Sequence, residues 1–236
     1  RKPELSCQEY QTSKYIQQKL DQIGIKNKII GDLKRAEREL EESNYEDLEL
    51  KRPTGVIGKI GSENEQKKTV ILRADIDALP ISESKEDNHF PSKKGFDSVN
   101  EGLMHACGHD AHTAMLLGGA KILKEFSDEI DGCIKFLFQP AEEIGVGAKS
   151  MISSGVLENA NTIFGMHVFP KLESGKIMVN DDYMMAADDM LKMKVKGGGG
   201  HGSTPHETMD PIFTAIQIID QIYGFFFLRF SFFLIT

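Results

Sequence analysis

The segment MHACGHDAH, residues 104–112, gathers three of the seven histidines and one of the three cysteines. Cys107 and His109 are two positions apart, so on an extended backbone both side chains point the same way and can reach one metal ion. If the segment is helical, His105 and His109, or His109 and His112, share a face instead. The pattern leaves these arrangements open, together with one in which the histidines begin a helix and pack in the core.

Two adjacent carboxylates, Glu142 and Glu143, follow the apolar segment 133–138 and Pro140. Carboxylates at the exit of a buried strand are costly unless water, a cation or a hydrogen-bond donor receives them. One of the two can bind a metal while its neighbour, which faces another way, handles a proton. A pair of solvated surface glutamates is the alternative interpretation.

His167 lies at the end of another apolar segment, IFGMHVFP at 163–170. Taken alone, it fits a core histidine with satisfied hydrogen bonds. Taken together, three strand-end loops offer sulfur, nitrogen and oxygen ligands from Cys107, His109, Glu143 and His167. This set suits Zn²⁺, Mn²⁺ or Co²⁺, and sites in open α/β sheets lie where the strands end.

The elements that would position these residues are short strands alternating with helices. Apolar runs predict strands at 28–30, 55–60, 69–73, 133–138 and 162–168, and periodic patterns predict helices at 8–23, 111–126 and 208–223. Because most of these strands lack polar alternation, both faces of the sheet should be covered, and the predicted fold class is α/β. The charged segment 33–52 is predicted to be a solvated helix or an insertion, and 82–101 a polar loop.

A second layer or domain is predicted to begin near residue 183. Residues 189–196 alternate polar and apolar side chains, which predicts a strand with one solvent-facing side. The glycines at 197–200 form a hinge-like break before the last predicted helix.

Composition excludes several classes of protein. A net charge of −8 without a basic stripe argues against nucleic acid as a partner. Three scattered cysteines are too few for a disulfide framework, which favours a reducing compartment. The chain opens at Arg1, so no leader can be interpreted, and a cytoplasmic location is only a working assumption.

The last thirteen residues, GFFFLRFSFFLIT at 224–236, contain six of the fourteen phenylalanines. They are too short for a spanning helix, which needs about 20 apolar residues, so no membrane span is expected. Three interpretations remain: a buried terminal strand, a membrane-surface anchor, or sequence that is not native to the protein. We favour the third, because the run has neither helical nor strand periodicity.

Six segments in order resemble the metal-dependent amidohydrolases that cleave N-acyl amino acids, such as indole-3-acetyl-amino acid hydrolases, hippurate hydrolases and N-acetyl-diaminopimelate deacetylases. They are RKPELSCQEY (1–10), LRADIDALPI (72–81), GLMHACGHDAHTAMLLGGAKIL (102–123), FQPAEE (138–143), FGMH (164–167) and GGGGHGSTPHETMDP (197–211). The resemblance covers 1–223 apart from 33–52. It implies a zinc-exopeptidase-like catalytic domain with a central mixed sheet, followed by the start of a smaller α+β dimerisation domain.

The resemblance also implies roles for the metal-binding segments. Cys107, His109, Glu143 and His167 would bind two divalent metal ions, Mn²⁺, Zn²⁺ or Co²⁺. Glu142 would be the general base that takes a proton from the attacking water.

Supporting roles follow from the same resemblance. Asp75 and Asp77 would support the ligands, although related exopeptidases use an aspartate as a bridging ligand. His105 and His112 would be structural. His201 would reach an active site, often that of a partner subunit, and bind the carbonyl or carboxylate of the substrate.

The implied activity is metal-dependent hydrolysis of small N-acyl amino acids, which releases a carboxylic acid and an amino acid, in a homodimer. The implied domains are 1–182 (catalytic), 183–223 (start of the dimerisation domain) and the atypical tail 224–236. In the family a later segment returns to the catalytic domain with a last ligand histidine. No histidine follows His206 here, so we expect a fragment. The alternatives are a dipeptidase or carboxypeptidase of the same superfamily, and a truncated product without activity.

Overall fold

The computed structural model describes residues 1–236 except 44, 46, 64–65, 182, 187–190 and 233–236, and side chains in the last helix only as far as Phe225. The chain divides into two compact units, Arg1–Met185 and Ala186–Thr236. Each unit is described by itself below.

The first unit is built on a five-stranded mixed sheet in the order β1-β2-β4-β3-β5, which confirms the predicted α/β class. Its strands are β1 (Lys26–Ile30), β2 (Gly55–Gly61), β3 (Thr69–Asp75), β4 (Cys133–Gln139) and β5 (Thr162–Gly165). β2 pairs antiparallel with β1 and β4, whereas β3 runs parallel to β4 and β5. Asp75 pairs with Gln139 and Arg73 with Gly165, so the carboxyl ends of three strands meet at one edge.

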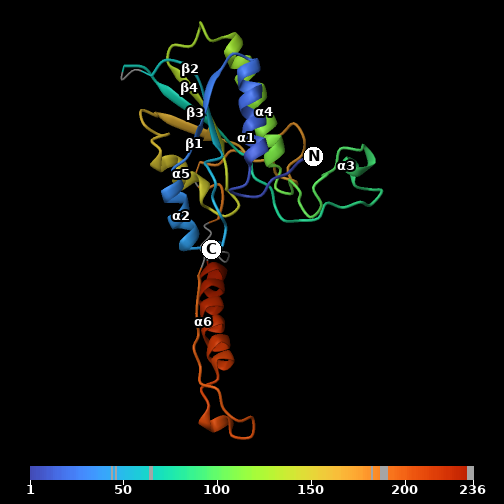
Figure 1. The fold of residues 1–236 in the computed structure, drawn as a ribbon, viewed down its shortest axis with the longest axis vertical. Helices are drawn as coiled ribbons and strands as arrows, with labels where there is room; N and C mark the ends of the chain where they lie inside the picture. The colour runs from blue at the N-terminus through green and yellow to red at the C-terminus, as the bar shows by residue number, and fades with distance from the viewer. Residues whose placement is uncertain (44, 46, 64–65, 182, 187–190, 233–236) are drawn as a thin grey trace. The chain divides into compact units, whose positions relative to one another are not determined.

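Helices cover both faces of this sheet. Figure 1 shows α1 (Tyr10–Gln22) and α4 (His109–Glu125) side by side along it. On the other face α5 (Gly147–Ser153) packs on β4 and contacts α2 (Leu33–Glu41). A short helix, α3 (Phe90–Lys93), interrupts the predicted polar loop.

The continuous apolar run of β4 is explained by this double coverage. Phe136 and Phe138 are buried in the cluster that includes Ile16 and Leu20 of α1. Leu137, between them, belongs to a separate cluster with residues of α5. Because successive side chains of a strand face opposite sides, a strand between two helical layers is mostly apolar. An exception in β4 is the buried Lys135, whose ammonium group donates to the carbonyl oxygens of Val156 and Glu158.

Two features of the first unit differ from the sequence-based expectations. The helix α5 was not predicted, since seven residues rich in small side chains give little periodicity. The charged segment 33–52 was predicted to be solvated, but α2 buries Ala36 and Leu40 on one face. Asp32 begins this helix by accepting a hydrogen bond from the Arg35 N–H at 3.2 Å.

The second unit contains a 3-10 turn, η1 (Pro205–Glu207), and the helix α6 (Pro211–Phe232). The predicted strand at 189–196 is wrong for 191–196, which carry no strand, while 189–190 lie outside the described residues. A strand needs a neighbour for its N–H and C=O groups, and nearby the described chain offers one isolated bridge, between Gly198 and Met209.

The helix α6 continues past residue 223, where the predicted helix ended. The terminal-strand interpretation of the Phe-rich tail is therefore wrong for 225–232, and 233–236 lie outside the described residues. Within the part of the chain that is described, no helix is long and apolar enough to cross a membrane.

Candidate metal centre

The acidic and histidine side chains singled out in the sequence meet where the three parallel strands end. Asp75 is the last residue of β3, and Asp77 follows two positions later. β4 leads through a turn to Glu142 and Glu143, and β5 is followed by His167. Parallel pairing places these exits at one edge, so the convergence follows from the sheet topology.

The start of α4 supplies the remaining candidates. His109 is the first residue of this helix and His112 lies one turn later, while Cys107 precedes it. Gly108 between them has a φ of 84°, and a Cβ there would lie 2.4 Å from Val168 Cγ2. Only glycine therefore fits at the position where the chain turns into the helix.

His109 lies at the centre of the cluster and is fully buried. Its Nδ1–H donates to the main-chain oxygen of Asp77 at 2.9 Å and lies 3.2 Å from Asp77 Oδ1. Its Nε2 is 3.7 Å from Asp75 Oδ2, 3.8 Å from Glu142 Oε2 and 3.7 Å from Glu143 Oε1. Because a carbonyl oxygen can only accept, the bond to Asp77 leaves the lone pair of Nε2 directed toward the carboxylates.

Two buried polar atoms of this cluster lack a hydrogen-bond partner within the described residues: His109 Nε2 and Glu143 Oε1. Such atoms are costly unless something binds them. Two ligand atoms about 2.1 Å from one Zn²⁺ in a tetrahedral arrangement lie about 3.4 Å apart, close to the observed 3.7 Å. The residues present therefore fit a divalent cation.

A second pair of candidate ligands lies beside the first. Cys107 Sγ is 3.4 Å from His167 Nε2. His167 Nδ1–H donates to the Val168 carbonyl oxygen at 2.6 Å, which leaves Nε2 without a proton and available as a ligand. Cys107, His109 and His167 form one group of potential ligands, and His109, Glu142 and Glu143 form another, so His109 is common to both.

The electrostatics of the site favour added positive charge. Burial raises the pKa of Glu143, and the Asp77 and Glu142 carboxylates raise it further. Burial, followed by the Glu143 charge, raises the pKa of the Cys107 thiol to about 11. Burial alone would lower the pKa of His109, but its hydrogen bond to Asp77 and nearby carboxylates outweigh this effect and raise it. A bound cation would relieve the repulsion among these acidic groups.

Asp75 and His112 form a hydrogen-bonded pair behind the ligand candidates. Asp75 Oδ1 is 2.5 Å from His112 Nδ1, and Arg73 donates to Asp75 Oδ2 at 2.7 Å. His112 Nε2 accepts the Val168 N–H at 2.9 Å, which leaves both ring nitrogens of His112 occupied. Through these contacts His112 links the end of β3 to the segment that follows His167.

The remaining sequence candidate is His201. It lies in the second unit, is exposed, and has Nδ1 2.8 Å from Ser203 Oγ. The sequence analysis also missed two contributors in the N-terminal segment, Ser6 and Glu9, which are buried beneath the loop that carries Glu142. Ordinary polar residues near the start of a chain give no sequence signal of burial.

The sequence model of the family described as "Peptidase family M20/M25/M40" matches residues 71–223 of the chain. Thermostable carboxypeptidase 2 of Saccharolobus solfataricus is 46% identical over 224 residues, which are 94% of this chain and 50% of that protein. IAA-amino acid hydrolase ILR1-like 4 of Arabidopsis thaliana is 40% identical over 217 residues, 92% of this chain and 43% of that protein.

A further relative is the N-acyl-L-amino acid amidohydrolase of Geobacillus stearothermophilus, 40% identical over 223 residues, 93% of this chain and 52% of that protein. The chain thus spans about half the length of the curated relatives that it matches.

Two solved structures share the fold. The Bacillus subtilis YxeP protein, described as a dinuclear metal-binding peptidase, has 39% sequence identity and a TM-score of 0.56 over 72% of this chain and 40% of that chain. A structure from methicillin-resistant Staphylococcus aureus has 32% identity and a TM-score of 0.68 over 95% of this chain and 52% of that chain. Both relationships support an exopeptidase-like fold.

Proposed function

The chain belongs to peptidase family M20/M25/M40, and from this premise we propose that it carries the metal-binding part of a hydrolase that cleaves the amide bond of N-acyl amino acids. The observation that carries the proposal is the pair of buried, unpartnered atoms His109 Nε2 and Glu143 Oε1, 3.7 Å apart. Their position at the ends of parallel strands is where this class of fold places its chemistry.

We assign two divalent metal ions to the site, with ligands from Cys107, His109, Glu143 and His167. The mixed sulfur, nitrogen and oxygen donors fit Zn²⁺, Mn²⁺ or Co²⁺. The resemblance to a dinuclear metal-binding peptidase supports two ions rather than one. Such ions, when bound, lower the pKa of water and polarise the amide carbonyl.

The protein side chains divide the remaining work. Glu142 is the general base: its side chain is 39% exposed, so it can meet substrate and water, and its Oε2 lies 3.8 Å from His109 Nε2. It takes a proton from the attacking water and passes it to the nitrogen of the leaving amino acid. Asp77 fixes the tautomer of His109, and Asp75 fixes His112.

The substrate class is argued from the relatives. Two of them are named as hydrolases of amides formed by amino acids. An N-acyl amino acid has a free α-carboxylate. A carboxypeptidase substrate has the same group at its C-terminus. Carboxypeptidase activity is therefore the second candidate, favoured by the 46% identity to a thermostable carboxypeptidase.

We assign 1–182 to the catalytic domain and 183–223 to the start of a dimerisation domain of a homodimeric enzyme. In that arrangement His201 binds the substrate's carbonyl or carboxylate. The tail 224–236 has no assigned function.

The test is a substrate panel with purified protein loaded separately with Zn²⁺, Mn²⁺ or Co²⁺. Release of free amino acid is measured from acetyl, benzoyl and indole-acetyl amino acids and from dipeptides and longer peptides. Preference for the acyl amino acids supports the first candidate, and preference for peptides supports the second. No hydrolysis of any substrate by metal-loaded, folded protein supports the truncated, inactive product.

The residue assignment is tested by Glu142→Gln, which should bind metal normally but lower kcat by about 10²- to 10⁴-fold. The matched control is Glu125→Gln at the far end of α4, about 24 Å along the helix from His109, which should leave kcat unchanged. Normal turnover by Glu142→Gln would refute its role as general base.

A further inference from the structure

One buried carboxylate outside the metal site connects the N-terminal segment to the loop that carries Glu142. Glu9 is fully buried at the start of α1. Its Oε1 accepts the N–H groups of Cys7 at 3.0 Å and Ala141 at 2.8 Å, and its Oε2 accepts the Thr54 hydroxyl at 2.7 Å. A carboxylate buried so completely is retained only where such donors compensate for its lost hydration.

The two residues that donate their N–H groups to Glu9 have an uncommon backbone conformation. Cys7 has a φ of 66° and Ala141 a φ of 47°. Among the described residues only one other non-glycine residue, Asn159, has a positive φ. Left-handed backbone is unfavourable for residues with a Cβ, and it persists where surrounding contacts enforce it. Both N–H groups end on one oxygen of Glu9, so this carboxylate holds both conformations.

A second carboxylate makes a parallel connection. Asp77 Oδ2 accepts the Ser6 hydroxyl at 2.7 Å and the Glu143 N–H at 3.0 Å. Ser6 and Cys7 are neighbours, and Ala141 and Glu143 flank Glu142. The backbone is therefore fixed on both sides of Glu142, while its side chain remains free to meet the substrate.

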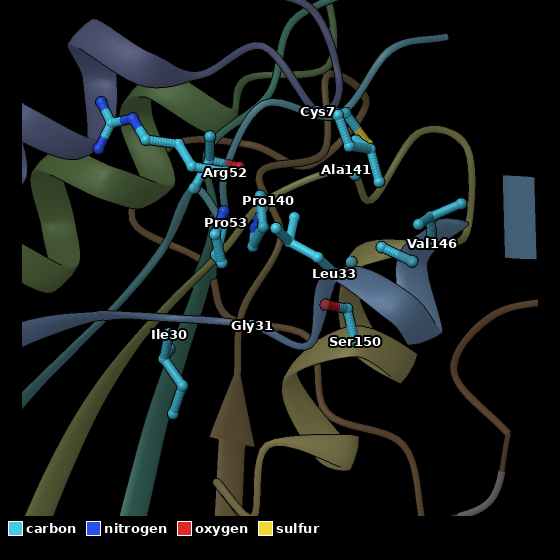
Figure 2. A pocket seen from close by; sticks show the side chains of 14 residues that line it. Cys7, Ile30, Gly31, Leu33, Arg52, Pro53, Pro140, Ala141, Val146 and Ser150 are labelled. Carbon is cyan, nitrogen blue, oxygen red and sulfur yellow. The ribbon is translucent and has the colours of Figure 1, made fainter. Parts of the chain in front are cut away.

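The rear of this loop is closed by packing. Figure 2 shows Cys7 beside Ala141, and both belong to one apolar cluster with Val146. These three residues are among those that line a cavity of about 30 Å³. At the end of the loop, a Cβ on Gly147 would lie 1.6 Å from the Pro140 oxygen. The loop therefore has little space in which to relax if Glu9 is lost.

We propose that Glu9 is a positioning residue of the metal centre. By accepting the Ala141 N–H, it holds the loop 140–143 in the conformation that presents Glu143 to the metal and Glu142 to the substrate. The kcat part of this inference rests on the proposed activity and the Zn²⁺-affinity part on the proposed metal site, whereas the loop geometry rests on neither.

The experiment compares Glu9→Leu with Glu9→Gln. Leucine has a similar volume but leaves three donors without an acceptor. Glutamine can keep all three contacts, because its oxygen can accept both N–H groups and its NH₂ can donate to the Thr54 hydroxyl. Leu20→Ala is the control for general destabilisation, since Leu20 is equally buried in α1 but belongs to the core cluster below α4.

The readouts are hydrogen exchange at the Ala141 and Glu143 amides, Zn²⁺ affinity by calorimetric titration, and kcat with the best substrate of the panel. We expect Glu9→Leu to accelerate exchange at both amides and weaken Zn²⁺ binding about 10- to 100-fold. Glu9→Gln should restore both, and Leu20→Ala should lower Tm without changing Zn²⁺ affinity.

The proposal would be overturned if Glu9→Leu had the same Zn²⁺ affinity and amide exchange as the wild type. It would also be overturned if Leu20→Ala lost as much Zn²⁺ affinity as Glu9→Leu. If Glu9→Leu does not fold, fast exchange of the Ala141 amide in the wild-type protein would overturn it, whereas slow exchange there together with full Zn²⁺ affinity in Glu9→Gln supports it. Absence of hydrolysis by the wild type would refute the proposed function alone, since exchange and Zn²⁺ affinity still decide the role of Glu9.

Discussion

The two units of the chain differ in how far their apolar side chains are buried. In Arg1–Met185, the β4 residues Phe136 and Phe138 are completely buried in a core cluster that they share with residues of α1 and α4. In Ala186–Thr236, Phe213 and Ile216 of α6 are 65% and 56% exposed. The first unit has its own core, and the described side chains of the second unit do not form one.

The difference shows which part of the chain carries the candidate metal centre. The clustered candidate ligands belong to the first unit, and their backbone is fixed by strand pairing, by buried carboxylates and by Gly108. Apolar burial is the main favourable contribution to folding, so the stability of the candidate site should depend on the first unit.

The largest expected effect is that of Phe136→Ala. Removing a fully buried aromatic ring from the central strand β4 should lower the free energy of unfolding by about 3–5 kcal/mol. Urea unfolding followed by circular dichroism measures it. A loss below about 1 kcal/mol would contradict a core centred on β4.

The pH dependence of stability tests the buried carboxylate beneath the loop. Burial raises the pKa of Glu9 from 4.5 to about 7, and its hydrogen bonds to Thr54 and Ala141, which lower the pKa, offset only part of this effect. The folded state therefore holds the proton more tightly than the unfolded state, and the contribution of Glu9 is greatest below pH 4.5 and is lost as the pH rises to about 7. The difference of about 2.5 units corresponds to about 3 kcal/mol.

This contribution is isolated by measuring urea unfolding from pH 4.5 to 8 in the wild type and in Glu9→Gln. Glutamine does not titrate, so stability relative to Glu9→Gln should fall across this range. A constant difference between the two proteins would show that Glu9 has an ordinary pKa.

The sequence was sufficient to predict most of the first unit. Its strands and long helices were predicted because buried strands are continuously apolar and surface helices are periodic, as at 133–138 and 8–23. The helix α5 and the buried face of α2 depend on their contact with each other, and this contact between segments far apart in the sequence has no local signal. The strand predicted at 189–196 rested on alternation alone, without evidence of a pairing partner.

The residues that we propose as metal ligands were singled out in the sequence for a different reason. Burying histidines and paired glutamates near strand ends costs free energy unless a metal ion or a hydrogen-bond partner compensates for it. Their residue types and spacing, together with a nearby cysteine, therefore indicate a metal site. Glu9 was not singled out in the sequence. Its proposed role depends on a hydrogen bond with Ala141, which lies 132 positions away, and the residue type of Ala141 does not predict its positive φ.

Within the first unit, Gly147→Ala should have a smaller effect than loss of the core ring. A Cβ there would lie 1.6 Å from the Pro140 oxygen, so the loop must shift, at a cost of about 1–3 kcal/mol. The control is Gly118→Ala in α4, where an added Cβ would have no atom within 4 Å. This substitution should stabilise the helix by up to about 1 kcal/mol. Thermal unfolding of both variants measures the two effects, and equal Tm values would contradict a tightly packed loop.

The smallest expected effect is that of Phe213→Ala in α6, which is the counterpart of Phe136→Ala. Its ring is 65% exposed, so truncation removes little buried area, and unfolding of the first unit should change by less than about 0.5 kcal/mol. The same urea experiment measures it, with circular dichroism reporting the sheet. Because exposed apolar surface promotes association, light scattering should also show less self-association in this variant. A stability loss above about 1 kcal/mol would mean that the ring is buried in solution, and the contrast between the two units would then be wrong.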